Sequence, residues 1–124
     1  MNKIQFITTD ELINLMASNK PFKLVDVLSR EHYNFEHIKG AISLPFEQLG
    51  EKAIDFLNKK DTIVVYCASF HCQASTNAAK QLMAMGFEHV LDYKGGLKDY
   101  KEGRLPVQGS ICGSFEGKRN TCIV

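Results

Sequence analysis

An apolar, β-branched run of five residues, Thr62 to Tyr66, ends directly at a cysteine, Cys67. A short loop follows this run, and an amphipathic helical stretch extends from about Ser75 to Met85. The run predicts a strand that is buried on both faces, as in a parallel sheet. The Cys67 thiol is then expected at the carboxyl end of a strand and beside a helix N-terminus, where backbone N–H groups and the helix dipole favour negative charge.

Such an environment favours the thiolate, which is the nucleophilic form of cysteine. A free thiol with a pKa near 8.5 is only a few per cent ionised at pH 7, and lowering its pKa by about two units requires roughly 2.7 kcal/mol. Several loop N–H groups and a helix N-terminus can supply that energy. We therefore interpret Cys67 as a reactive nucleophile. The alternative is a small buried hydrophobe at a strand end.

Short strand and helix patterns alternate along the rest of the chain. Further strands are expected at residues 4–7 and 22–27, after the turn at Gly40, and at residues 89–91. The expected helices follow Thr8, follow Ser29, lie between Phe46 and Leu57 with a break at Gly50, and lie over residues 97–101. This alternation predicts an α/β sandwich with a mainly parallel sheet. Sites in such sheets form at the carboxyl ends of the strands.

Local signals define several helix ends. Thr8 and Glu11 have the spacing of a capping box, and Gly86 stands where a left-handed residue is wanted after a helix. Ser75 is most simply the N-cap of the helix that follows the cysteine loop.

Composition excludes several classes of function. The 124 residues have a net charge of +1 and no basic run, so neither a nucleic acid nor a membrane surface is expected as a partner. No apolar stretch approaches the roughly 20 residues of a membrane span, and the N-terminus lacks the apolar core of a signal peptide. We therefore expect a cytoplasmic protein. In that compartment four reduced thiols are expected: Cys67, Cys72, Cys112 and Cys122.

The histidines His32, His37 and His89 are too scattered to predict a metal site, and the cysteines do not form paired C-x-x-C units. No metal and no cofactor are therefore expected.

Three separated motifs carry a family resemblance. They are Leu24-Val25-Asp26-Val27-Leu28 with His37-Ile38-Lys39-Gly40-Ala41-Ile42-Ser43-Leu44-Pro45, then Val64-Val65-Tyr66-Cys67 with Ala78-Ala79, and finally Asp92-Tyr93-Lys94-Gly95-Gly96-Leu97 with Leu105-Pro106-Val107. Together they resemble the rhodanese-like family of sulfurtransferase domains. The resemblance implies a three-layer sandwich with a mainly parallel, five-stranded central sheet and helices on both faces. It implies one domain over residues 1–107, and we expect residues 108–124 to be a loosely packed or partly disordered tail.

The resemblance also implies an activity. Rhodaneses use one cysteine to take a sulfane sulfur from a donor such as thiosulfate, hold it as a persulfide and pass it to a thiophile. Cys67 matches that cysteine. The implied partners are a small-molecule donor (thiosulfate, a polysulfide or a persulfide) and a thiol or cyanide acceptor, with a protein persulfide as a further candidate. The implied substrate-binding loop consists of Ala68, Ser69, Phe70, His71, Cys72 and Gln73.

The loop departs from the common pattern of the family. Cys72 and Gln73 stand where an arginine and a serine are usual, and the loop is longer than the common form. The missing basic residues argue against thiosulfate itself as the physiological donor. Cys72 is either a thiol that resolves an oxidised or persulfidated Cys67, or simply a loop cysteine. His71 either contacts an anionic donor or is a solvated loop histidine.

Asp26 has two interpretations as well. It either orients loop N–H groups from the neighbouring strand end or is a structural carboxylate that caps backbone donors.

Two rival functions follow from the same cysteine and loop. Phosphatases and arsenate reductases that resemble rhodaneses need a loop arginine to bind a tetrahedral oxyanion, and residues 68–75 contain none. A redox-sensing or binding module would use the Cys67 and Cys72 pair without turnover.

Overall fold

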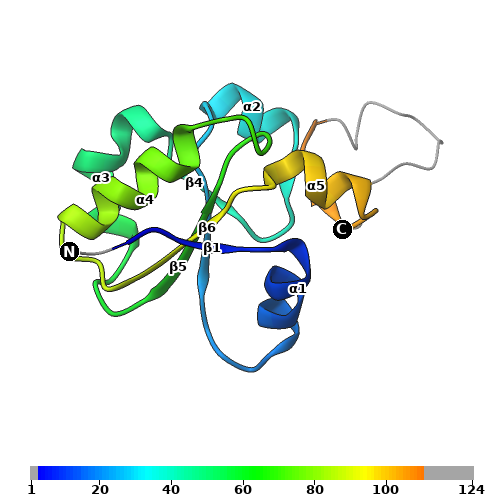
Figure 1. Cartoon of the computed structure of the whole chain (residues 1–124). Coiled ribbons are helices and arrows are strands. Elements are labelled where there is room, and N and C mark those ends of the chain that lie inside the picture. Colours follow the sequence, from blue (N-terminus) through cyan, green and yellow to red (C-terminus); the bar gives the residue numbers. More distant parts are fainter. Residues whose placement is uncertain (1–2, 111–124) are drawn as a thin grey trace.

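A computed structural model of the protein describes residues 3–110, which fold around a five-stranded sheet (Figure 1). Every neighbouring pair of strands in this sheet is parallel. Across the sheet the strands lie in the order β1 (Gln5–Ile7), β6 (His89–Tyr93), β5 (Thr62–Tyr66), β2 (Lys23–Asp26) and β4 (Ile42–Ser43). The predicted α/β class with a mainly parallel, five-stranded central sheet is confirmed.

Helices cover both faces of the sheet (Figure 1). The helical elements are α1 (Thr9–Ala17), α2 (Arg30–Phe35), the 3₁₀ turn η1 (Phe46–Gln48), α3 (Leu49–Phe56), α4 (Ala74–Ala84) and α5 (Gly96–Glu102). Helices α3 and α4 pack on one face, and α1 and α5 pack on the other. Among residues 3–110, no helix is long and apolar enough to cross a membrane.

Strand β5 supplies side chains to both cores because successive strand residues point to opposite faces. Ile63 and Val65 lie in the core under α3 and α4, whereas Val64 and Tyr66 lie in the core under α1 and α5. Cys67 continues this alternation and packs on the α3 and α4 side. The position of the cysteine side chain is therefore set by the strand that precedes it.

A second, two-stranded sheet was not predicted. It pairs β3 (His37–Ile38) with β7 (Val107–Gln108) in antiparallel fashion. Paired structure thus continues to Gln108, one residue beyond the expected end of the domain. Most of the expected tail, with Cys112 and Cys122, lies outside the described residues.

The capping signals of the first helix are confirmed. The Thr8 hydroxyl accepts the Glu11 N–H at 3.1 Å, and the Glu11 carboxylate accepts the Thr8 N–H at 2.8 Å. Gly86 follows α4 with a φ of +100°, as expected for a residue that ends a helix in the left-handed region.

Two local predictions are wrong. Gly50 lies inside α3 and is not a break between helices. A Cβ there would come within 2.8 Å of Gln81 Nε2, the end of a flexible side chain on α4, so Gly50 lies at the contact between α3 and α4. Ser75 is not the N-cap of α4, because the helix begins at Ala74 with Gln73 at the N-cap position. Ser75 is instead fully buried in the first turn.

A buried carboxylate joins three segments next to the end of β5. Asp26 accepts the Leu28 N–H and the Tyr66 hydroxyl, both at 2.9 Å. The same hydroxyl accepts the Ile38 N–H at 2.9 Å. Burial raises the pKa of the Asp26 carboxyl, and its two hydrogen bonds act in the opposite direction. These contacts are those of a structural carboxylate that caps a backbone donor, and Asp26 reaches the cysteine loop only through Tyr66.

The start of α5 packs directly on the chain that leaves β5. Gly96 has a φ of +64°, and a Cβ there would lie 2.4 Å from the Cys67 carbonyl oxygen. The Leu97 N–H donates to that oxygen at 2.9 Å, and the Lys98 N–H donates to the Ala68 carbonyl oxygen at 2.8 Å. Glycine is required here for both its conformation and its lack of a side chain.

Asp26→Asn tests the buried carboxyl. Because its pKa is raised above the ordinary 3.8, Asp26 contributes stability below that value, and this stability is lost as the pH rises through the raised pKa. We expect the free energy of unfolding of the wild type, minus that of Asp26→Asn, to fall as the pH rises from below the ordinary value of 3.8 through the raised pKa. Urea unfolding followed by circular dichroism measures this difference.

Asp61→Asn is the matched control. The Asn58 N–H and Lys23 lower the pKa of Asp61, so its contribution is present above the ordinary value and is lost as the pH falls. The corresponding difference should rise with pH up to about the ordinary value of 3.8 and stay constant above it. A flat or rising difference for Asp26→Asn would contradict the assignment.

Candidate active site

The loop that follows β5 forms the candidate site. It joins Cys67 to α4 at the carboxyl edge of the sheet and contains all six residues predicted to bind substrate. The Cys72 N–H donates to the Ser69 carbonyl oxygen at 3.0 Å, which folds the loop back on itself. Within the loop Ser69 and Cys72 are half-buried, whereas the exposed residues are Ala68, Phe70, His71 and Gln73. Phe70 and His71 make an edge-on ring contact with centroids 6.1 Å apart.

The Cys67 side chain lies beneath this loop and is fully buried. Its Sγ donates to the Cys72 carbonyl oxygen at 3.5 Å. Burial is the main cause that raises the pKa of Cys67, and the hydrogen bond with the Cys72 side chain raises it further. The Ser75 hydroxyl and N–H act in the opposite direction. The prediction that the surroundings lower the pKa of Cys67 is therefore wrong for this reduced, closed arrangement.

Ser75 faces the Cys67 sulfur from the first turn of α4. Its buried hydroxyl has no hydrogen-bond partner that meets normal geometry among the described residues, and its interaction with Cys67 is the one that favours the thiolate. A buried hydroxyl without a strong partner is available to a new acceptor. An anionic sulfur on Cys67 would be such an acceptor.

The loop amides converge on Cys72 instead. Burial opposes ionisation of this thiol, but the hydrogen bond from Cys67, the N–H groups of Ala74 and Ala68, and the charge of Lys94 together lower its pKa. The amide cradle that was expected around Cys67 thus serves the second cysteine of the loop. The two thiols, both free, form a pair in which Cys72 is the more acidic.

Lys94 is a site residue that the sequence analysis missed. It follows β6 directly, and its ammonium donates to the Cys72 carbonyl oxygen at 2.6 Å. The same group lies 5.9 Å from the centre of the Phe70 ring. The available signal was its place after β6, because the carboxyl ends of neighbouring parallel strands share an edge. Lys94 supplies a positive charge to a loop that has no arginine.

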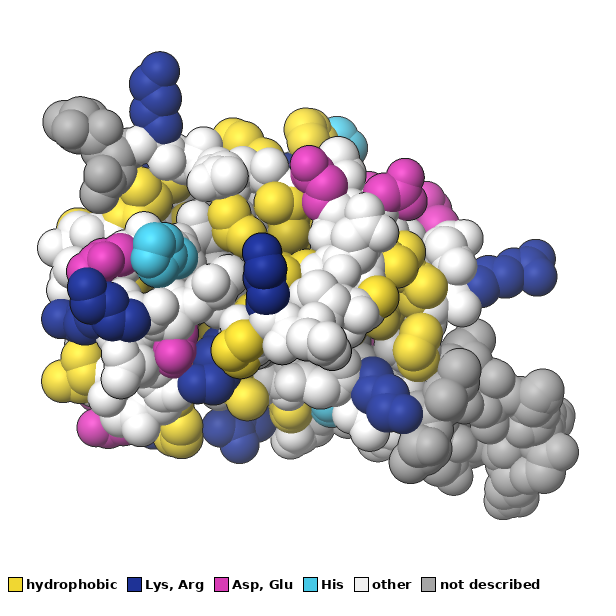
Figure 2. All heavy atoms as spheres, turned by 90° about the horizontal axis from the view of Figure 1, so that it is seen from below, with side chains coloured by type: hydrophobic (Ala, Val, Ile, Leu, Met, Phe, Trp, Pro, Cys, Tyr) yellow, Lys and Arg dark blue, Asp and Glu magenta, His cyan; other side chains and the backbone are white. Residues whose placement is uncertain are grey.

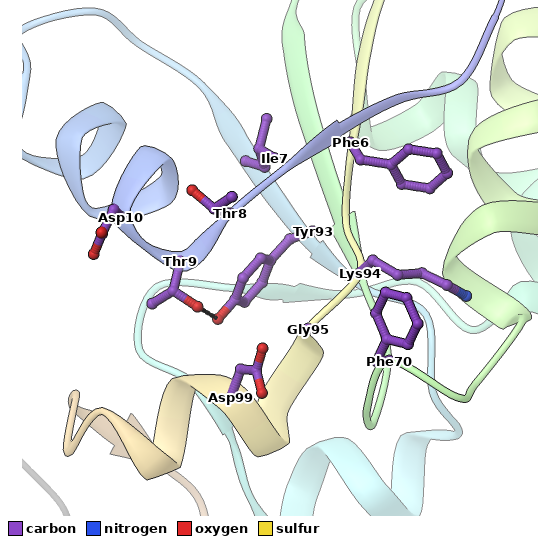
Figure 3. A pocket seen from close by; sticks show the side chains of 10 residues that line it. All are labelled: Phe6, Ile7, Thr8, Thr9, Asp10, Phe70, Tyr93, Lys94, Gly95 and Asp99. Atoms are coloured by element: carbon purple, nitrogen blue, oxygen red, sulfur yellow. Dashed lines mark hydrogen bonds between the residues drawn. The ribbon is translucent and has the colours of Figure 1, made fainter.

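Two cavities flank the loop. One, of about 660 Å³, contains Phe70 and Lys94 in its wall (Figure 3). The other, of about 360 Å³, is lined by Ala68, Leu97, Lys98, Lys101 and Glu102. Cys67 lines neither cavity. Within residues 3–110, no three His, Cys, Asp or Glu side chains gather in a cluster that could hold a metal ion.

The wider surface shows no concentration of positive charge on the face in Figure 2. Acidic and basic side chains are interspersed there, with apolar side chains between them. The loop, the two cysteines Cys67 and Cys72, and Lys94 therefore form the candidate site.

Comparisons with known proteins agree with this geometry. The family model of the rhodanese-like domain matches residues 8–103. The chain is 38% identical over 77 residues to thiosulfate sulfurtransferase PspE of Escherichia coli, a match that covers 60% of the chain and 70% of PspE. It is 30% identical over 105 residues to thiosulfate sulfurtransferase GlpE of Shewanella oneidensis, covering 82% of the chain and 97% of GlpE.

A solved structure has the same fold. The rhodanese-like domain of the Alr3790 protein from Anabaena sp. superposes with a TM-score of 0.81 and 31% identity, over 99% of this chain and 92% of that domain. The chain spans only 45% and 43% of two other relatives, which are longer proteins. A match over most of the chain to the family model, with a parallel sheet and a cysteine at the end of its central strand, shows that the chain belongs to the rhodanese-like domain family.

Proposed function

We propose that the protein is a single-domain sulfurtransferase that carries a sulfane sulfur as a persulfide on Cys67. The observation that supports this most is the position of Cys67, which ends β5 beneath the loop. There the Ser75 hydroxyl and N–H favour its thiolate, and the Lys94 ammonium contacts the same Cys72 carbonyl oxygen as the Cys67 sulfur. Relatives of similar length named thiosulfate sulfurtransferase support the reaction class.

In the first step Cys67 attacks the outer sulfur of the donor. A new bond forms between the two sulfurs, and the donor's own bond to that sulfur breaks and leaves its electron pair with the departing group, which is sulfite for thiosulfate. The Cys67 proton has to leave as the attack proceeds. We assign Cys72 as its acceptor: the lowered pKa of Cys72 favours the thiolate form, which can take up a proton, and its side chain interacts with that of Cys67. The transfer is driven by formation of the new sulfur–sulfur bond.

In the second step an acceptor such as a thiol or cyanide attacks the outer sulfur of the persulfide. The bond between the two sulfurs breaks, and its electron pair returns to Cys67 as a thiolate. Until then the persulfide anion requires donors. The Ser75 hydroxyl and N–H, together with the Lys94 ammonium, are the groups that can stabilise it.

The buried position of Cys67 adds a conformational requirement. No donor can reach the sulfur while the residue is fully covered. We infer that the loop of residues 68–73 opens to admit the donor and closes over the persulfide, which would shield it from water.

The charge at the loop favours a sulfur donor over a phosphate ester. A tetrahedral oxyanion is best held by a guanidinium, which donates two parallel hydrogen bonds, whereas Lys94 offers a single point charge. The donor class we propose is thiosulfate, a polysulfide or another persulfide, which includes a persulfide on a partner protein. Thiosulfate is itself a tetrahedral oxyanion, so within this class the loop without arginine favours a polysulfide or a persulfide.

A second candidate function rests on the contact between the two thiols. If Cys67 is oxidised to a sulfenic acid, Cys72 can attack its sulfur, form a disulfide and release hydroxide, which takes up a proton as water. An external thiol would reduce the disulfide again. This reaction would make the pair a redox switch that closes the sulfur-transfer site.

The persulfide is tested by mass spectrometry. After incubation with thiosulfate or a polysulfide, the peptide that contains Cys67 should gain about 32 Da, the mass of one sulfur. The Cys67→Ser variant should show no gain on this peptide, and its transfer of sulfur to cyanide should fall to the background rate. Persistent absence of the adduct from Cys67, with sulfur transfer retained, would rule out the proposed intermediate.

The role of Cys72 as proton acceptor is tested by the pH dependence of alkylation. Removing Cys72 removes a hydrogen bond and a charge that raise the pKa of Cys67, although burial still raises it. We therefore expect the rate profile for iodoacetamide at Cys67 to shift to lower pH in Cys72→Ala. His71→Ala, an exposed neighbour in the loop, serves as the control and should leave the profile in place. An upward shift in Cys72→Ala would contradict the coupling.

The redox switch has a separate test. Mild treatment with hydrogen peroxide should link Cys67 to Cys72, and peptide mapping should locate the bond, which dithiothreitol reverses. In Cys72→Ser a sulfenic acid on Cys67 should persist long enough to react with dimedone. Labelling of Cys67 at equal rates in both proteins would argue against Cys72 as a resolving thiol.

A further inference from the structure

The larger cavity lies beside the cysteine loop at the carboxyl ends of β1 and β6 (Figure 3). Its volume of about 660 Å³ is typical of a site for a small organic molecule. Three chain segments that are distant in the sequence enclose it: the turn from β1 into α1, the turn from β6 into α5, and the loop after Cys67. The cavity is therefore part of the same sheet edge as the reactive sulfur.

Aromatic side chains form one wall of the cavity. Phe6 from β1 is 54% exposed, and Phe70 from the cysteine loop is 64% exposed. In Figure 3 the Lys94 side chain passes between the two rings. Ile7 and Tyr93 add further apolar surface. Two large rings left open to solvent beside a reactive site favour a ligand with an apolar body.

Lys94 links the cavity to the reactive sulfur. Its ammonium contacts the Cys72 carbonyl oxygen, and the Cys67 thiol contacts the same oxygen. The distance between the ammonium nitrogen and the Cys67 sulfur is therefore at most the sum of these two contact distances. A ligand whose anionic head lies at Lys94 would place that head close to Cys67.

The opposite side of the cavity is acidic. Asp10 lies there on the far side of Tyr93 from the Phe70 ring, and Asp99 lies below Tyr93, on α5 (Figure 3). The Tyr93 hydroxyl and the Thr9 hydroxyl are already hydrogen-bonded to each other at 2.6 Å. The carboxylates repel an anionic head and Lys94 attracts it, so the charges of the cavity impose one orientation on an anionic ligand.

We propose that this cavity binds the organic body of the sulfur donor, an anion with an aromatic or branched apolar group next to its sulfane sulfur. The inference rests on the proposed sulfur transfer and specifies its substrate class. An organic thiosulfonate has the required form, because its outer sulfur is anionic and its substituent is apolar.

Transfer of the outer sulfur from such a donor conserves atoms and electrons. With benzenethiosulfonate, the Cys67 thiolate bonds to the outer sulfur, and the bond between the two donor sulfurs breaks and leaves its electron pair on benzenesulfinate. Cyanide then takes the outer sulfur from the persulfide as thiocyanate and restores the Cys67 thiolate.

The kinetic test compares two donors that have the same reacting group. For the wild type, kcat/KM is measured with benzenethiosulfonate and with thiosulfate, and the ratio of the two values is the readout. Phe6→Ala should lower this ratio about tenfold, mainly through KM for benzenethiosulfonate, because it removes apolar contact with the body of the donor.

Phe56→Ala is the matched control. Phe56 has a similar exposure of 57% but lies on α3, outside the cavity, so its substitution should leave the ratio unchanged. An unchanged ratio in Phe6→Ala would overturn the proposed binding of the organic body.

A binding measurement separates this inference from the sulfur transfer itself. Calorimetric titration of benzenethiosulfonate into the Cys67→Ser variant should show binding that Phe6→Ala weakens about tenfold. If neither donor is turned over but this difference appears, the sulfur transfer fails and the cavity is still a ligand site. If both donors are turned over and Phe6→Ala changes neither the ratio nor the binding, the cavity proposal fails alone.

Discussion

The burial of β5 on both faces is the constraint from which the rest of the site follows. Its backbone pairs with β2 on one side and β6 on the other, and its side chains from Ile63 to Tyr66 are buried in the two cores. Chemistry can begin only where the strand ends, at Cys67. Three neighbours then hold the chain that leaves it: the start of α5 donates to the Cys67 and Ala68 carbonyl oxygens, Lys94 contacts the loop, and Ser75 lies beside the sulfur.

The two thiols differ in how well their surroundings accommodate a negative charge. Burial disfavours an anion on Cys67, and the loop donors favour one on Cys72. A sulfur anion in this low-dielectric region is stable only where several donors face it. In the proposed reaction Cys72 loses its charge when it takes the Cys67 proton, and the negative charge passes to the outer sulfur of the persulfide. The Lys94 ammonium near both sulfurs is then the group best placed to compensate that charge, whichever sulfur carries it.

The sequence predicts correctly those features that depend only on a few neighbouring residues. The β-branched run before Cys67, the capping box at Thr8 and the glycine at Gly86 each specify their structure within a few residues, and the structure has all three. Sequence reasoning failed where distant segments meet. Gly50 reads as a helix break until Gln81 of another helix is seen beside it. The contact of Lys94 with the loop depends on β6 lying next to β5. Which of the two thiols interacts with the backbone N–H groups depends on how a loop of unusual length folds.

The loop of residues 68–73 contains no arginine, and Lys94, which follows β6, supplies its positive charge, which bears on the specificity of the proposed sulfur transfer. An arginine within the loop would hold an inorganic oxyanion through two hydrogen bonds and would itself fill the mouth of the site. Lys94 instead brings its positive charge from the end of β6, where its ammonium donates to the Cys72 carbonyl oxygen. The Phe70 ring stays exposed at the cavity. Charge alone then discriminates weakly between small anions, because an ammonium is a point charge without directional preference. In the proposed transfer, selection among sulfur donors then depends on the shape and apolar surface of the cavity that Phe6 and Phe70 line. The loop without arginine and the exposed aromatic wall would act together in recognising the donor.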